Sequence, residues 1–272
     1  MSLEADIQLI DSGNDLCASR FDGREVISFD FDLCGENLQF NISAGTGMVG
    51  LGAIVPVARA ICDKITDCVV QKNIEQGRRI PCCQGCSNCC KYLVTVSSAE
   101  VFSFADDVKK LDSLFYKYVQ RKALLACKKM LKKKSPVFSS NYQLDALSDW
   151  YKSLNFSCPF LFEGRCSIYD VRPITCREYF ITGSPNVCKS KRGSAEVLQM
   201  PVSLANILND FCAEMEGQSD VSIMLPLFQV WANENSERKM RQFPAEHMVR
   251  TFVELFEKAV LKNKEKIEIC CH

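Results

Sequence analysis

Residues 82–90 read Cys82-Cys83-Gln84-Gly85-Cys86-Ser87-Asn88-Cys89-Cys90, which places five cysteines within nine positions. Two residues separate Cys83 from Cys86 and Cys86 from Cys89, and Cys90 follows directly. Such gaps let successive thiolates curl round one metal ion or cluster, and Gly85 gives the backbone freedom to turn. Five buried, unreactive thiols would have no packing rationale at this density. The stretch therefore predicts a cysteine-rich metal-binding core packed by the rest of the chain.

A second group of cysteines follows in wider steps. It consists of Cys158, which precedes a proline, and of Cys166, Cys176 and Cys188. These gaps are too wide for zinc knuckles, which are built from tight Cys-x2-Cys pairs. A turn-rich loop containing Pro173 can nevertheless bring the thiolates back to the first group. Arg172 and Arg177 can donate hydrogen bonds to sulfur and offset thiolate charge. The alternative for these arginines is surface ion pairing with Asp170 or Glu178.

The composition is that of a globular protein with an unusual amount of sulfur. The chain has 272 residues, 33 basic and 33 acidic side chains, 47% hydrophobic residues and 17 cysteines. These values exclude the disordered, collagenous and membrane classes. Only two histidines are present, His247 and His272, so a metal site must rest mainly on thiolates. Zero net charge predicts no general attraction to nucleic acid or anionic lipid.

The arrangement of the cysteines indicates a reducing compartment. Their number is odd and three pairs are adjacent in sequence, which is atypical of a secreted disulfide framework. Residues 1–13 lack the basic and apolar regions of a secretory signal, and the longest uncharged apolar stretch, residues 48–58, is shorter than the roughly 20 residues of a membrane span. We therefore expect a cytoplasmic protein, in which clustered cysteines bind metal or do redox chemistry.

Hydrophobic periodicity predicts a mainly α fold with a small N-terminal β-hairpin, in the α+β class. Alternating apolar residues predict hairpin strands at 27–33 and 38–42, and helical spacing predicts a helix over 54–77. A short strand is expected at 93–96, and Ser97 with Glu100 forms a capping box for the next helix. Further helix is expected towards residue 134, over 144–154 and from 202 onward. We divide the chain into a hairpin and helix (1–80), a metal-binding domain (81–192) and a helical segment (193–272), packed as one globular unit.

Three further features have competing interpretations. Residues 109–134 hold ten basic side chains and one acid, which favours a solvated helix face over a nucleic-acid or acidic-partner patch. The glycine run at 45–50, with Asp63 or Asp67 downstream, suits either a nucleotide or S-adenosylmethionine site or a glycine-rich connector. His247 is expected to be an ordinary helical residue. The terminal Cys270-Cys271-His272 is a possible metal ligand set at a chain end that is expected to fray.

Two quoted runs carry a resemblance to a known family. GRRIPCCQGCSNCCKYLVTVSSAEV and CPFLFEGRCSIYDVRPITCREYFITGSPNVC, between residues 77 and 188, resemble the YkgJ-type or CxxCxxCC family of zinc- or iron-chelating proteins. The resemblance implies metal ligands at Cys83, Cys86, Cys89, Cys90, Cys158, Cys166, Cys176 and Cys188. In some relatives the first cysteine lies four residues before the second, which here would be Cys82. The second run is also similar to one in flagellin lysine methylases.

The expected function is an iron–sulfur protein, with [4Fe-4S] favoured. Cys-x2-Cys-x2-Cys with the remote Cys158-Pro159 is similar to the thiolate arrangement of bacterial ferredoxins. The role would be electron transfer with a redox partner protein, or catalysis at the cluster, and the sequence names no substrate. The alternatives are a structural zinc module and an S-adenosylmethionine-dependent methylase. Four thiolates suffice for one centre, so eight imply either two centres or thiols that do not bind the metal. We expect neither a membrane nor a nucleic-acid partner.

Overall fold

The computed structural model describes residues 7–10, 20–21, 24–33, 35–133, 144–189, 196–219 and 222–263. Its helices are α1 (Val55–Glu75), α2 (Ser98–Asp107), α3 (Ser113–Lys132), α4 (Leu144–Ser153), α5 (Ile174–Arg177), α6 (Leu204–Glu216), α7 (Phe228–Glu234), α8 (Ser236–Met240) and α9 (Ala245–Lys262). Its strands are β1 (Ile7–Ile10), β2 (Arg20–Phe21), β3 (Arg24–Leu33), β4 (Glu36–Ala44), β5 (Met48–Gly50), β6 (Thr95–Val96), β7 (Leu161–Phe162), β8 (Arg165–Cys166), β9 (Ile223–Met224) and β10 (Gln242–Pro244). The predicted class, mainly α with a small N-terminal β element, is confirmed.

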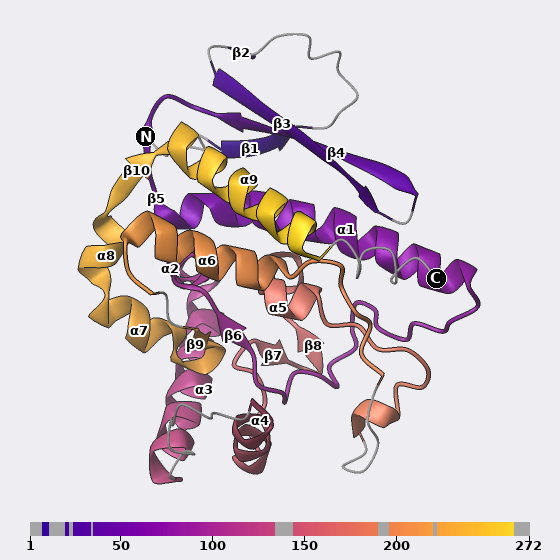
Figure 1. Ribbon diagram of the computed structural model, residues 1–272. Coiled ribbons are helices and arrows are strands. Elements are labelled where there is room, and N and C mark those ends of the chain that lie inside the picture. Colours follow the sequence, from indigo (N-terminus) through magenta and orange to yellow (C-terminus); the bar gives the residue numbers. More distant parts are fainter. Residues whose placement is uncertain are drawn as a thin grey trace.

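The N-terminal β element is larger than the predicted hairpin. β3 and β4 form that hairpin, and β1 and β2 pair outside them in an antiparallel sheet of order β1-β4-β3-β2. Alternation along β3 buries Phe29, Phe31 and Leu33 on one face. The ring of Phe256, on α9, lies 5.2 Å from that of Phe29 and 5.6 Å from that of Phe31. One face of the sheet is therefore covered by α9, as Figure 1 shows.

The helix predicted over 54–77 is α1, and its end is set by a glycine. Gly77 has a φ of +78°, a left-handed conformation that favours glycine. The Gly77 amide donates to the Ile74 carbonyl and the Arg78 amide to the Asn73 carbonyl, which satisfies carbonyls of the last turn. The chain thereby leaves α1 and turns directly into residues 82–90.

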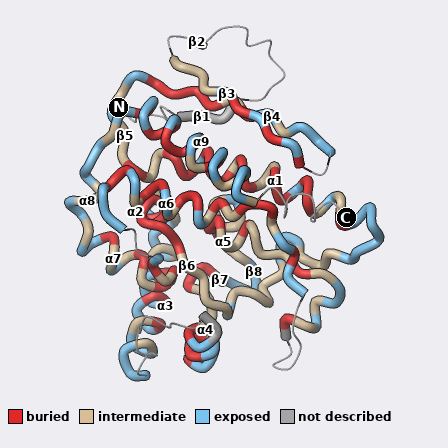
Figure 2. The backbone as a smooth tube through the Cα atoms, in the orientation of Figure 1, coloured by how far each residue is buried: buried red, intermediate tan, exposed pale blue. Residues whose placement is uncertain are grey.

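Of the three hydrophobic cores among the described residues, the two larger ones include residues that flank the cysteine segments. The larger core joins the sheet to α1, α6 and α9, and the smaller one packs α2 and α3 against α7 and residues 158–171. Phe160, fully buried in the smaller core, stacks near Phe104 and Phe228. Figure 2 shows the cysteine loops as mostly intermediate in exposure beside these buried helices. Both cores thus position the loops from regular elements far apart in the sequence.

The C-terminal part departs from the continuous helical pattern that was predicted. It contains α6 to α9, but β9 pairs with β6, and β10 pairs with β5. The capping box is confirmed: the Ser97 side chain accepts from the Glu100 amide, and the Glu100 side chain accepts from the Ser97 amide. Within the described ranges, no helix has both the length and the apolar character needed to cross a bilayer.

Candidate metal centre

The first cysteine loop is a chain of tight turns. The Cys86 amide donates to the Cys83 carbonyl at 3.1 Å, and the Cys90 amide donates to the Ser87 carbonyl at 3.1 Å. Gly85 lies within the first of these turns and has a φ of +92°, a conformation that other residues rarely adopt. All five thiols of this loop line one cavity.

The second cysteine group lies on a short hairpin and its approaches. β7 and β8 are joined by Glu163 and Gly164, both with positive φ, as a tight two-residue turn requires. Cys158 precedes this hairpin and Cys166 ends it. The Cys158 amide donates to the Cys90 carbonyl at 2.6 Å, so a backbone hydrogen bond joins the two cysteine groups.

Cys176 is held by a single helical turn with two side-chain anchors. The amide of Ile174, at the start of α5, donates to Glu100 Oε1 at 2.8 Å. The Thr175 hydroxyl donates to the Thr95 carbonyl at 2.9 Å. Because Glu100 also caps α2, one buried carboxylate connects α2 to the turn that carries Cys176.

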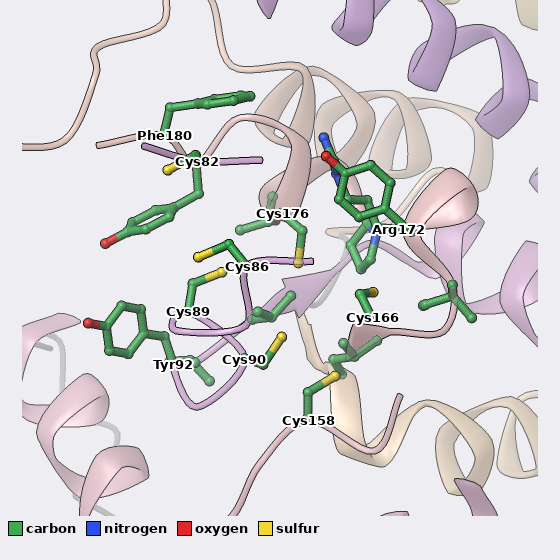
Figure 3. A pocket seen from close by; sticks show the side chains of 18 of the residues that line it. Cys82, Cys86, Cys89, Cys90, Tyr92, Cys158, Cys166, Arg172, Cys176 and Phe180 are labelled. Atoms are coloured by element: carbon green, nitrogen blue, oxygen red, sulfur yellow. The ribbon is translucent and has the colours of Figure 1, made fainter. Parts of the chain in front are cut away.

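These segments enclose a cavity of about 150 Å³ whose wall is rich in sulfur (Figure 3). The cysteines that line it are Cys82, Cys83, Cys86, Cys89, Cys90, Cys158, Cys166 and Cys176. Aromatic rings of Tyr92, Tyr169, Tyr179 and Phe180 complete much of the wall, together with Arg172. In Figure 3 the labelled cysteines of both groups are arranged round the same space. The two cysteine groups therefore share one cavity.

Seven of the eight cysteines expected as ligands line this cavity, and Cys188 does not. Cys188 is buried beside it, and its carbonyl accepts a hydrogen bond from the Tyr92 hydroxyl at 2.9 Å. Cys82, which the resemblance offered as an alternative to Cys83, is half-buried, and the Ile181 amide donates to its sulfur at 3.4 Å. Cys83 is exposed at the rim.

Burial keeps most of these thiols protonated when no metal is bound. It raises the pKa of Cys158 to about 12 and that of Cys176 well above its usual range. At Cys89, by contrast, a hydrogen bond from Cys90 and the charge of Arg172 lower the pKa. That hydrogen bond and burial raise the pKa of Cys90. Metal binding at this cavity must therefore displace protons from sulfur.

The two arginines named from the sequence differ in their surroundings. Arg172 lines the cavity, with its guanidinium 4.0 Å from the centre of the Tyr169 ring and its Nε without a hydrogen-bond partner among the described residues. Arg177 instead forms an ion pair with Asp63, and its Nε donates to the Arg172 carbonyl at 3.1 Å. The expectation of a sulfur contact from Arg177 was therefore wrong, because Asp63 on α1 occupies its guanidinium.

A single ion and a cluster make different demands on the thiolates that bind them. Within the described ranges, no three His, Cys, Asp or Glu side chains converge closely enough to hold a single metal ion as they stand. One zinc ion would draw its four sulfurs to within about 3.8 Å of one another, from Zn–S bonds of about 2.3 Å. A four-iron cluster keeps its thiolates farther apart because each binds a different iron. Eight cysteines line this cavity of about 150 Å³, which is more thiolates than either kind of centre needs.

The glycine run has a packing role in this structure. β5 pairs with β10, and the Ala245 amide donates to the Gly47 carbonyl. A Cβ at Gly52 would come within 3.1 Å of the Ser103 amide nitrogen, so the chain passes close against α2 there. β4, which precedes the run, pairs only antiparallel within the described sheet, unlike the strand of a dinucleotide-binding unit. These contacts favour the glycine-rich connector.

The remaining candidates lie elsewhere. His247 is an exposed residue of α9. Cys270, Cys271 and His272 lie outside the described residues. No signal in the sequence pointed to the aromatic wall of the cavity, because Tyr92, Tyr169 and Tyr179 lie in irregular segments or short turns without periodicity.

Comparison with known proteins gives one result. The model of the CxxCxxCC family, described as "Putative zinc- or iron-chelating domain", matches residues 82–193. No curated protein and no solved structure matches the chain. The matched region begins at Cys82 and contains every cysteine of both groups. The match covers less than half of the chain, and within it residues 82–193 are similar to the family that the two cysteine runs resemble.

Proposed function

We propose that the shared cavity holds a cysteine-ligated iron–sulfur cluster, most simply [4Fe-4S], and that the chain is an electron-transfer protein of a reducing cytoplasm. The family match supports metal binding in general. The observation that carries the finer proposal is a cavity of about 150 Å³ with eight cysteines in its wall. An all-thiolate donor set with few competing oxygen or nitrogen ligands suits iron–sulfur clusters and zinc. Thiols distributed round one cavity, with no three of the described side chains placed to hold one ion, favour the cluster.

The ligands are proposed to come from both cysteine groups. Cys89 is the common neighbour, since its charge acts on Cys158, Cys166 and Cys176 from the second group and on Cys82 from its own. The Cys158–Cys90 backbone hydrogen bond fixes the two groups side by side. A cluster bound here supplies a site that accepts and releases one electron. The chain's own residues exclude water with the aromatic wall and offset negative charge with Arg172.

Electron paramagnetic resonance of the protein purified without oxygen tests this proposal. We expect no signal from the oxidised protein and a signal typical of a reduced [4Fe-4S] centre after dithionite is added, lost again on reoxidation. A zinc-loaded protein that stays colourless and silent after dithionite would contradict the iron–sulfur proposal and favour a structural zinc module.

A further inference from the structure

Among the described residues, helix α3 presents a basic face without acidic partners. Its 20 residues contain six lysines and arginines and no acid. Lys117, Arg121, Lys128 and Lys132 are exposed and form no ion pair within the part of the chain that the structure describes. By contrast, Lys109 and Lys110, just before the helix, pair with Asp106 and Asp107. The uncompensated charge therefore begins with the helix and runs along it for about 30 Å.

Exposed leucines accompany these cations. The exposed fractions are 75% for Leu114, 54% for Leu124, 49% for Leu125 and 87% for Leu131. The opposite side of α3 buries Val119, Ala123 and Ala126 in the protein. We call the eight exposed residues 114, 117, 121, 124, 125, 128, 131 and 132 the α3 face. Solvation explains exposed lysines, but four large exposed leucines on one helix favour a contact surface.

The α3 helix is joined directly to the segment that carries Cys158. The Tyr118 hydroxyl donates to the Leu161 carbonyl at 3.0 Å, and Lys122 Nζ donates to the Ser157 hydroxyl at 3.3 Å. Lys129 Nζ donates to the Asn155 carbonyl at 2.8 Å. The α3 face is therefore separated from this cysteine segment by about one helix diameter, ~10 Å. In Figure 1, α3 runs down the lower left of the molecule, and β7 and β8 lie to the right of its upper end.

The order of side chains round the helix favours a protein partner. At 100° per residue, Lys117, Arg121 and Lys128 form the centre of the face and the leucines lie on both flanks. A helix that lies in a membrane has the reverse arrangement, with an apolar centre and basic flanks. Single-stranded nucleic acid stacks its bases on aromatic rings, and the α3 face contains none. Phe115 and Tyr118 lie off this face, where they stack on each other and meet the partly exposed Phe162 edge-on. A central cationic row instead complements carboxylates on another protein.

We propose that the α3 face docks an acidic one-electron carrier protein, which delivers its electron to the metal centre beside Cys158. The delivery of the electron rests on the proposed iron–sulfur centre, whereas the docking does not. In the transfer step the reduced carrier loses one electron and the oxidised cluster gains it, and no atom or proton is exchanged. The carboxylates of the carrier pair with the central cations, and its apolar side chains cover the flanking leucines.

Reduction by flavodoxin, an acidic flavin protein, tests the proposal on the full-length, metal-loaded chain. The test variant is Lys117→Glu/Lys128→Glu. The matched control is Lys258→Glu/Lys262→Glu on α9, which alters the net charge equally at exposed lysines away from α3. At low ionic strength we expect the rate constant for reduction by flavodoxin hydroquinone to fall at least about tenfold in the test variant only. The difference should vanish at about 0.5 M salt.

A second pair of variants tests the leucines. Leu131→Ser should weaken the binding of oxidised flavodoxin about tenfold at any salt concentration, as expected when one large apolar contact is lost. Leu261→Ser, at an α9 leucine that is 74% exposed, should leave the binding unchanged. Calorimetric titration measures this binding whichever metal the protein holds.

The outcomes separate the two proposals. If dithionite finds no reducible iron but flavodoxin binding depends on α3, the docking surface stands and the iron–sulfur proposal fails. If the centre is reducible but equal rates are found for the test and control variants, the docking proposal is wrong. Binding of phosphatidylserine vesicles or of a single-stranded oligonucleotide that depends on Lys117 and Lys128, without flavodoxin binding, would also overturn it.

Discussion

The family resemblance offers either Cys82 or Cys83 as a metal ligand, and the surroundings of the two residues distinguish them. Cys82 is half-buried and its sulfur accepts a hydrogen bond from the Ile181 amide, as sulfur ligands of metal centres commonly do. Cys83 is exposed. We therefore expect Cys82→Ser to reduce metal affinity by at least the roughly 10–100-fold that follows loss of a ligand's supporting contact. Cys83→Ser is the matched control and should retain its metal. Metal competition measures both affinities. If Cys83→Ser loses metal affinity and Cys82→Ser keeps it, Cys83 is the ligand.

Arg172 is the cation in the cavity wall, and it should adjust the reduction potential of the centre. Its guanidinium lies over Tyr169, and its charge helps to lower the pKa of Cys89. Reduction adds a negative charge, which a nearby cation stabilises, so Arg172→Gln should lower the potential. A lost charge-assisted contact of about 1.5 kcal/mol corresponds to roughly 60 mV for one electron. Redox titration should show this shift at unchanged metal content, with Arg172→Lys restoring much of it. An unchanged potential in Arg172→Gln would remove Arg172 from this role.

At the scale of elements, Glu100 connects the start of α2 to the turn that holds Cys176. It is fully buried and accepts hydrogen bonds from the amides of Ser97 and Ile174. Glu100→Ala should cost at least about 2 kcal/mol of unfolding free energy, because a helix cap is lost and the buried Ile174 amide is left unpaired. It should also reduce bound metal. Ser97→Ala is the control: it weakens the cap by about 1 kcal/mol and leaves the Ile174 contact intact. Urea unfolding and metal analysis of both variants check this, and equal metal loss in the two would contradict the connection.

Short sequence motifs predicted those helix ends that are determined by residues close by in the sequence. The capping box at Ser97 and Glu100 and the stop at Gly77 lie within a few residues of the helix ends that they define. The β7–β8 hairpin escaped prediction because its strands have two residues each and its Glu163-Gly164 turn lacks the common Asn-Gly signal. The pairing of β5 with β10 joins segments that are far apart in the sequence, and the hydrophobic pattern of neither segment indicates its partner.

The cysteine site likewise combines features set by nearby residues with features set by packing between distant segments. Spacing and the family resemblance identified seven of the cysteines in the cavity wall. The positions of Cys82 and Cys188 relative to the cavity depend on how residues 180–189 pack against the first loop, which spacing does not contain. The ion pair of Arg177 with Asp63 likewise depends on the approach of α1 to α5.

At the scale of the whole molecule, a shared centre would close a long loop. Cys90 and Cys158 are 68 positions apart, and the intervening chain includes α2, α3 and α4. By the loop-entropy relation for a cross-link, closing this loop contributes about 4 kcal/mol, and metal binding becomes folding free energy. We expect chelation or Cys86→Ser to lower the melting temperature by roughly 10 °C. Cys127→Ser, on α3 and outside the cavity wall, should change it little. An unaltered melting curve for the metal-free protein would show that the fold does not depend on the centre.

The central claim is that an iron–sulfur cluster bridges the two cysteine groups. The most direct measurement is the content of iron, labile sulfide and zinc in the protein purified without oxygen, compared with its Cys89→Ser and Cys158→Ser variants. The account predicts iron and sulfide in equal amounts, about four of each per cluster, and loss of both from either variant. Stoichiometric zinc without sulfide, or metal retained by Cys158→Ser and lost only from variants within residues 82–90, would contradict it.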